Sequence, residues 1–90
     1  MKKTIITVVG EDQVGIIAKV CTYLAENNVN VLNITQSIVD GWFNMMMITD
    51  TNGASKPFAQ LNDELAREGE QISVTIKMQH EDIFKTMHRI

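Results

Sequence analysis

The chain has 90 residues, 44% of them hydrophobic and 21% charged, which is the composition of one ordinary globular domain. Eight Lys and Arg against eleven Asp and Glu leave a net charge of −3. This balance argues against a nucleic-acid or anionic-membrane surface, because both require clustered positive charge. The single cysteine, Cys21, excludes an internal disulfide and a multi-cysteine metal site. With no targeting or membrane-spanning segment in the pattern, we expect a cytoplasmic protein.

The first two elements predicted are a strand and a helix. Residues 4–9 are rich in β-branched side chains, with apolar residues on both faces of the predicted strand. Residues 14–27 have the apolar spacing of an amphipathic helix. Its stripe consists of Ile17, Val20, Cys21 and Leu24. We expect Asp12 to cap the start of this helix, and Asn27-Asn28 to end it in a left-handed turn.

A hairpin is predicted next. Residues 30–39 alternate, with Leu32, Ile34 and Ile38 on one side and Asn33, Thr35 and Ser37 on the other. Asp40-Gly41 predicts a two-residue turn with positive φ. Residues 42–49 then return as a strand that is apolar on both faces, which is typical of a central strand. One of its faces carries Trp42, Met46 and Ile48, and the other carries Phe43, Met45 and Met47.

The second half adds a helix, a strand and a tail. Ser55 is the expected cap of the second helix, which has Pro57 in its first turn, buries Phe58, Leu61 and Leu65, and ends at Gly69. Residues 72–79 alternate as a strand with one solvated face. The tail, about residues 80–90, predicts an amphipathic C-terminal helix. Its apolar positions are Ile83, Phe84, Met87 and Ile90.

The βαββαβ order predicts an α+β ferredoxin-like sandwich, because right-handed crossovers leave one compact arrangement. In it, both helices cover one face of an antiparallel four-stranded sheet, with the first and third strands in the middle. The whole chain, 1–90, forms one domain. We expect Phe43, Met45 and Met47 to lie on the second face, covered by the tail or by a twin subunit. A homodimer is favoured. Whether the subunits meet at strand edges or faces stays open, as does whether the tail crosses between them.

Few residues suggest chemistry. Gly10 and Gly15 have the spacing of a phosphate-binding loop, but Ile16-Ile17 replace its Lys-Ser/Thr pair. Glycine in a first helical turn has two equal explanations: the close approach of a ligand, or tight packing on the adjacent strand. Asn30 and Asn33 offer donors and acceptors for an amino acid, although turn chemistry and a solvated edge explain them more simply.

Catalytic and metal sites are not predicted. His80 and His88 are eight residues apart, too far for a helical metal pair. Cys21 falls in the helix stripe, and no serine or cysteine has a recognisable base partner. We therefore expect neither catalytic residues, nor a metal, nor a cofactor, and the protein is not predicted to be an enzyme.

One stretch resembles a known family. The first strand, Asp12-Gln13-Val14-Gly15-Ile16-Ile17, a helix and then Asn30-Val31 with Asn33-Ile34 closely resemble the ACT domain over about residues 3–79. The chain is most similar to small bacterial proteins that consist of a single ACT domain, and to the ACT repeats of the glycine-cleavage regulator. ACT domains are regulatory modules of ferredoxin-like fold that bind small ligands, mostly in amino-acid metabolism.

In that family, effectors bind between paired domains, at the first β-to-α turn and the start of the second strand. The resemblance therefore implies an allosteric module that binds an amino acid at a dimer interface. No enzyme, transporter or DNA-binding domain is attached, so the signal would pass to a separate protein partner. The alternative is a module without a ligand that docks on a metabolic enzyme or regulator. The ligand-binding residues implied are Asp12, Gln13, Val14, Gly15 and Ile16, with Asn30 and Asn33 opposite.

Overall fold

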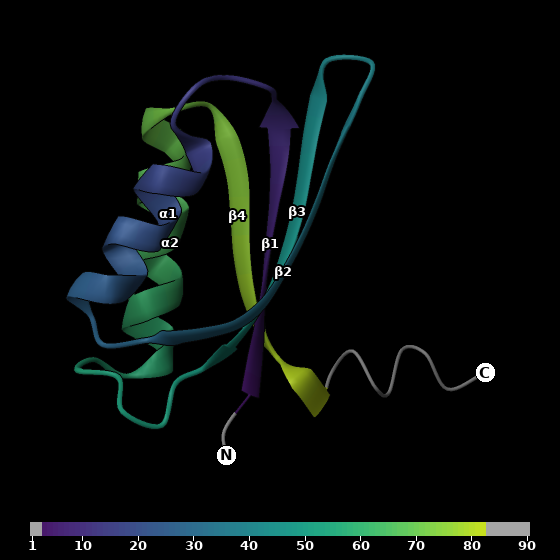
Figure 1. Ribbon diagram of the computed structural model, residues 1–90. Helices are drawn as coiled ribbons and strands as arrows, with labels where there is room; N and C mark the ends of the chain where they lie inside the picture. Colours follow the sequence, from purple (N-terminus) through teal and green to yellow (C-terminus); the bar gives the residue numbers. More distant parts are fainter. Residues whose placement is uncertain (1–2, 83–90) are drawn as a thin grey trace.

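Six elements follow one another in the predicted order in the computed structural model, which describes residues 3–82. They are β1 (Lys3–Glu11), α1 (Ile16–Glu26), β2 (Asn30–Val39), β3 (Trp42–Asp50), α2 (Phe58–Gln71) and β4 (Val74–His80). The strands form one antiparallel sheet in the order β2-β3-β1-β4. Both helices pack on the same face of it (Figure 1). The predicted ferredoxin-like sandwich, with β1 and β3 in the middle, is thus confirmed.

The core lies between the helices and the sheet. Alternate side chains of the strands meet the apolar stripes of both helices there, which removes most of their surface from water. The buried set includes Ile6, Val8, Val20, Leu24, Phe43, Met45, Met47, Leu61, Leu65, Val74, Ile76 and Met78. At one end of this layer Thr4 and Thr49 are fully buried. Their hydroxyl oxygens are 2.5 Å apart, and this mutual hydrogen bond offsets the cost of burying both groups.

The two faces of β3 are the reverse of the prediction. Phe43, Met45 and Met47 lie under the helices and are at most 3% exposed, whereas Trp42 is 53% exposed on the open face. Register explains the difference: these three residues pair with Gly10, Val8 and Ile6 of β1 and share their face. A strand that is apolar on both sides does not by itself show which side is covered.

Both predicted helix caps are wrong, whereas both predicted turns are confirmed. α1 begins at Ile16, after Gly15, and α2 begins at Phe58, after Pro57; neither helix start has a side-chain cap. The turn residues Asn28, Asp40 and Gly41 have φ of 57°, 53° and 83°.

The end of α2 and the start of β4 also lie later than predicted. α2 continues past Gly69 to Gln71. Gly69 is buried where the helix crosses β4, and a Cβ there would lie 2.6 Å from the carbonyl oxygen of Val74. Ser73 then turns with φ 58°, so β4 starts at Val74.

The predicted C-terminal helix falls mainly on residues outside the described range of 3–82. His80, where that helix was expected to begin, is the last residue of β4. Within residues 3–82, no helix is both long and apolar enough to cross a membrane.

Candidate ligand site at the β1–α1 turn

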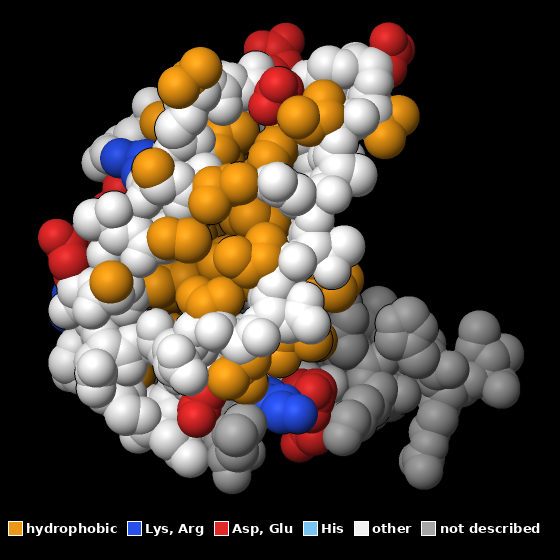
Figure 2. Space-filling model, in the orientation of Figure 1, with side chains coloured by type: hydrophobic (Ala, Val, Ile, Leu, Met, Phe, Trp, Pro, Cys, Tyr) orange, Lys and Arg blue, Asp and Glu red, His pale blue; other side chains and the backbone are white. Residues whose placement is uncertain are grey.

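A groove of about 450 Å³ lies between the β1–α1 turn and β2. It is lined by Asp12, Gln13, Val14, Gly15, Ile16, Ile17, Ala18, Gln36, Ile38 and Phe43. Figure 2 shows hydrophobic side chains gathered in the hollow between the helices and the β2–β3 hairpin. The groove exists because α1 scarcely contacts β2. Ile34 and Ile38 face the helix side, yet they remain 41% and 59% exposed.

Two hydrogen bonds hold the β1–α1 turn in place. The backbone N–H of Asp12 donates to the carbonyl oxygen of Gly41 in the β2–β3 turn, at 2.9 Å. The side-chain amide of Gln13 donates from Nε2 to the carbonyl oxygen of Ile72, just after α2, at 2.6 Å. The β1–α1 turn is therefore fixed between the β2–β3 turn and the segment that joins α2 to β4, which gives the groove a preformed wall.

The backbone conformation at position 15 requires glycine. Its φ of 95° and ψ of 0° lie in the left-handed region, where side chains other than glycine are strained. No heavy atom lies within 4 Å of the position that a Cβ would take. The explanation from tight packing on the adjacent strand is therefore wrong, and the space beside Gly15 opens into the groove.

The groove also receives the N-terminus of α1. Gly15, Ile16, Ile17 and Ala18 all line it, and the first hydrogen bond of the helix runs from Lys19 N–H to Gly15 O. The N–H groups before Lys19 lack partners within the helix, and this end carries a partial positive charge. Together with the apolar wall made by Ile38 and Phe43, these groups suit an anionic group attached to an apolar body.

The seven predicted site residues fall into two groups in one chain. Asp12, Gln13, Val14, Gly15 and Ile16 all line the groove. Asn30 and Asn33 do not line it. Asn30 pairs with Asp50, and Asp50 pairs with Lys3 at the start of β1. Asn30 therefore lies at the end of the sheet opposite to the groove.

Sequence reasoning missed the opposite wall of the groove, Gln36, Ile38 and Phe43. The hairpin turn held a usable signal for two of them. A two-residue turn at Asp40-Gly41 sets Ile38 opposite Phe43, at the end of the sheet that the first β-to-α turn also reaches.

The two edges of the sheet differ. β2 has ten residues without a charge or a proline, and among them only Val31 is even partly buried. β4 is protected by α2, since Met78 N–H donates to Asn62 Oδ1 at 3.0 Å. Long, uncharged edges are the ones that pair with another chain, so β2 is the edge available to a partner.

The outer side of α1 is joined to α2 by polar contacts. Tyr23 donates from its hydroxyl to Glu64 at 2.5 Å, and Lys56 reaches the same carboxylate at 2.8 Å. Lys19 pairs with Glu68 at 2.9 Å. Burial, and then the hydrogen bond to Glu64, raise the pKa of Tyr23. These groups hold the helices together on the side away from the groove.

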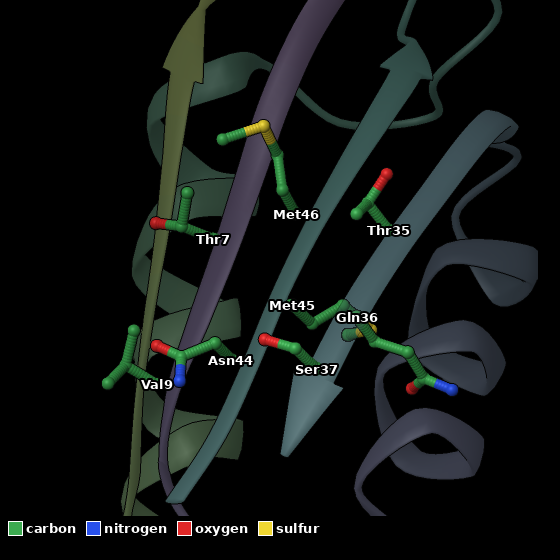
Figure 3. Close-up of a pocket in the computed structure, with 8 residues that line it drawn as sticks. All are labelled: Thr7, Val9, Thr35, Gln36, Ser37, Asn44, Met45 and Met46. Atoms are coloured by element: carbon green, nitrogen blue, oxygen red, sulfur yellow. The ribbon is translucent and has the colours of Figure 1, made fainter. Parts of the chain in front are cut away.

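A second, smaller hollow of about 240 Å³ lies on the open face across β1, β3 and β2 (Figure 3). Its lining consists of Thr7, Val9, Thr35, Gln36, Ser37, Asn44, Met45 and Met46. None of these side chains is charged, so this hollow offers no ion pair to an ionised ligand. In the described part of the chain, no group of His, Cys, Asp and Glu has an arrangement that could hold a metal ion.

Comparison with known sequences identifies the family. The sequence pattern of the ACT domain matches residues 2–79, which takes in the whole sandwich except His80, the last residue of β4. The chain belongs to the ACT domain family. As an ACT domain, it is 58% identical over 90 residues to a UPF0237 protein of Bifidobacterium longum, with all of both chains aligned.

Solved structures agree with this assignment. An ACT domain protein from Streptococcus pneumoniae superposes with a TM-score of 0.81 at 36% identity, over 92% of this ACT domain and 93% of that chain. A putative glycine cleavage system transcriptional repressor shares the fold at 20% identity and a TM-score of 0.74, over 88% of this chain and 45% of that one.

Proposed function

We propose that this ACT domain is a non-catalytic regulatory module that binds a small ligand, an amino acid, in the groove at the β1–α1 turn. The groove lies at the interface of a homodimer, and the signal passes to a separate protein partner. One observation carries this proposal: the groove has a fixed wall on one side and, on the other, the uncovered edge strand β2 with Ile34 and Ile38 exposed.

A second copy paired along β2 would complete the groove. In a twofold arrangement the two β2 strands run antiparallel, so the first residues of one lie beside the last residues of the other. Asn30 and Asn33 of the second copy then lie at the same end of the sheet as Ile38 and the β1–α1 turn of the first. Their side chains lie on the open face, because they pair with Asp50 and Ile48, whereas the groove is on the helix face. The arrangement therefore brings the two groups of predicted residues to one end of the sheet, but on opposite faces.

The groups of the groove match the two ends of an amino acid. The unpaired N–H groups at the start of α1 accept a carboxylate. The side chain of Asp12, which is exposed at the rim, accepts a hydrogen bond from the ammonium group. Ile38 and Phe43 provide an apolar surface for the ligand's side chain. An apolar amino acid is therefore the ligand class that the lining favours.

Signalling would follow from differential binding. A ligand held between two subunits favours the arrangement in which both walls are in place, because it binds that arrangement more tightly. The separate partner then responds to which arrangement is populated.

The test is thermal unfolding of the full chain against a panel of free amino acids, with the mass in solution measured alongside. At tenfold excess over Kd, a ligand specific to the folded state adds about 1.4 kcal/mol, which raises the midpoint by several degrees in a domain of this size. No shift across the panel at millimolar concentrations would reject the amino-acid proposal.

Two variants localise the site, each beside a matched control. Asp12→Ala is expected to abolish the shift, whereas Glu11→Ala, one residue away on the open face, retains it. Gln36→Ala, at a position that lines the groove, is expected to weaken the shift, whereas Thr35→Ala, its neighbour on the open face, does not. All four side chains are exposed, so folding is preserved in each variant.

The alternative is a protein-docking module without a small ligand. The exposed apolar residues Val9, Val39 and Trp42 on the open face favour it, since they form a contact surface away from the groove. Substituting Trp42 by Ser would then abolish capture of the partner. In the ligand-binding proposal, the same change leaves the thermal shift intact.

A further inference from the structure

The open face of the sheet carries an exposed apolar patch beside the β2–β3 turn. Trp42 pairs with Val39 on one side and with Glu11 on the other, and Val9 lies one row further along β1. The side chains of Val9, Val39 and Trp42, the open-face patch, are 47%, 62% and 53% exposed. An exposed apolar surface that contains a tryptophan is typical of a protein–protein contact.

The hollow of about 240 Å³ lies on the same face, two residues along β3 from this tryptophan. Met46 is in the middle of it, with Thr7 on one side and Thr35 on the other (Figure 3). Its volume is below the roughly 300–1,000 Å³ of pockets for small-molecule ligands. An uncharged hollow of this size suits a single aromatic side chain.

The charges of the open face indicate which chain packs there. In the described range this face carries four charged side chains: Lys3, Glu11, Asp50 and Lys77. Lys3 and Asp50 are directly opposite each other on β1 and β3, so their charges offset each other. Glu11 and Lys77 have uncharged cross-strand neighbours, Trp42 and Thr7, and neither takes part in an ion pair within residues 3–82. The face thus presents one uncompensated charge of each sign.

These features complement one another under a twofold axis. Thr7, the neighbour of Lys77, and Glu11 are equally far from Val9 along β1, about 7 Å on either side. An axis between two copies that crosses the strands at Val9 therefore places Glu11 of each copy over Thr7 of the other, beside Lys77. On β3, the same axis places Trp42 over Met46, because the row of Val9 passes through Asn44.

We propose that the open face binds a second copy of this chain about that twofold axis. Trp42 of each copy then occupies the hollow of the other, Val9 packs on Val9, and two Glu11–Lys77 ion pairs flank the apolar centre. The contact uses neither the groove nor the β2 edge, so this proposal is independent of the ligand site.

Sedimentation of the full chain in an Ile34→Lys background tests the proposal, since that change opposes pairing along β2 and leaves the face contact to be measured. One sheet face makes a small, weak contact, so we expect the mass of two copies at hundreds of micromolar and low salt. Glu11→Lys or Lys77→Glu turns two attractive pairs into repulsive ones and should weaken association at least about tenfold. An equal mixture of the two variants should associate again, because each lysine then meets a glutamate.

Charge changes outside the open face provide the controls. Glu70→Lys and Arg67→Glu, both exposed on α2, should leave association unchanged. All four side chains are exposed, so each variant is expected to fold. If the Ile34→Lys chain stays a single copy at hundreds of micromolar, the proposal is wrong. It is also wrong if the charge changes on the face act no more strongly than these controls, or if the mixture does not associate.

Fluorescence provides an independent readout, because Trp42 is the single tryptophan of the chain. Its emission should move to shorter wavelength as the protein concentration rises, since the ring leaves water on entering the hollow. The shift should be absent in Glu11→Lys alone and return in the mixture. Association without any change in the emission of Trp42 would show that the copies meet through another surface.

Discussion

Glu64 of α2 accepts a hydrogen bond from Tyr23 of α1, and its contacts make stability depend on pH. Lys56, Tyr23 and Gln60 all donate hydrogen bonds to its carboxylate. Together they lower its pKa from 4.5 to about 2. Because the folded-state pKa lies below the unfolded value, the stabilisation is complete above about pH 4.5 and is lost as the pH falls toward 2.

Glu64→Gln should therefore flatten the acid limb of the stability curve. We expect the melting temperature of the unchanged protein to fall more steeply between pH 4.5 and 2.5 than that of the variant, measured by circular dichroism. Asp63→Asn, at the exposed neighbouring position, is the control and should keep the steep fall. Parallel curves for the parent and Glu64→Gln would show that the contacts do not favour the ionised form.

Gly15 permits a second prediction for a single residue. At φ 95°, alanine costs about 1–2 kcal/mol, and asparagine costs less because it tolerates the left-handed region. Gly15→Ala should lower the free energy of unfolding by that amount and Gly15→Asn by roughly half of it, as measured in urea. Nothing lies within 4 Å of the added Cβ, so neither change introduces a clash. Equal stability of Gly15→Ala and the parent would contradict the left-handed turn.

For whole elements, the sequence predicted all six and their order, because each is bounded by a turn signal such as Asp40-Gly41. It missed the starts of both helices, since Gly15 and Pro57 precede their first residues in place of the expected caps Asp12 and Ser55, and it ended α2 two residues early. It could not identify the covered face of β3, which depends on pairing with β1. One wall of the candidate site was local in sequence and predictable, whereas Gln36, Ile38 and Phe43 reach it only through the hairpin register.

The contact between α2 and β4 makes a prediction at the level of elements. A Cβ on Gly69 would lie 2.6 Å from Val74 O and 3.0 Å from Ile76 Cγ1. A backbone atom cannot yield as a flexible side chain does, so the helix must move. Gly69→Ala should cost about 1–3 kcal/mol in urea unfolding, although alanine favours helices by up to about 1 kcal/mol. Glu70→Ala, exposed on the same turn, should cost little; a stabilised Gly69→Ala variant would refute the close contact.

At the scale of the whole molecule, the asymmetry of the two sheet edges decides how copies associate. On β4 the N–H of Met78 is taken by Asn62, whereas β2 presents an uncharged backbone edge with Ile34 and Ile38 exposed beside it. A small domain with such an edge gains stability by pairing it. The groove, the edge strand and the proposed dimer thus belong to one surface.

A charge placed on each edge of the sheet tests whether the two copies pair along β2. Ile34→Lys puts an ammonium in the middle of β2, where twofold pairing would bury it near its own copy. Since Ile34 is already 41% exposed, the fold should survive. We expect sedimentation at tens of micromolar to show a dimer for the parent and a monomer for Ile34→Lys, which should also lose its response to the amino acid. Thr75→Lys, exposed on β4, should keep both properties. If Thr75→Lys dissociates the dimer while Ile34→Lys does not, the copies meet through β4 or the open face, and the ligand site is not completed by β2.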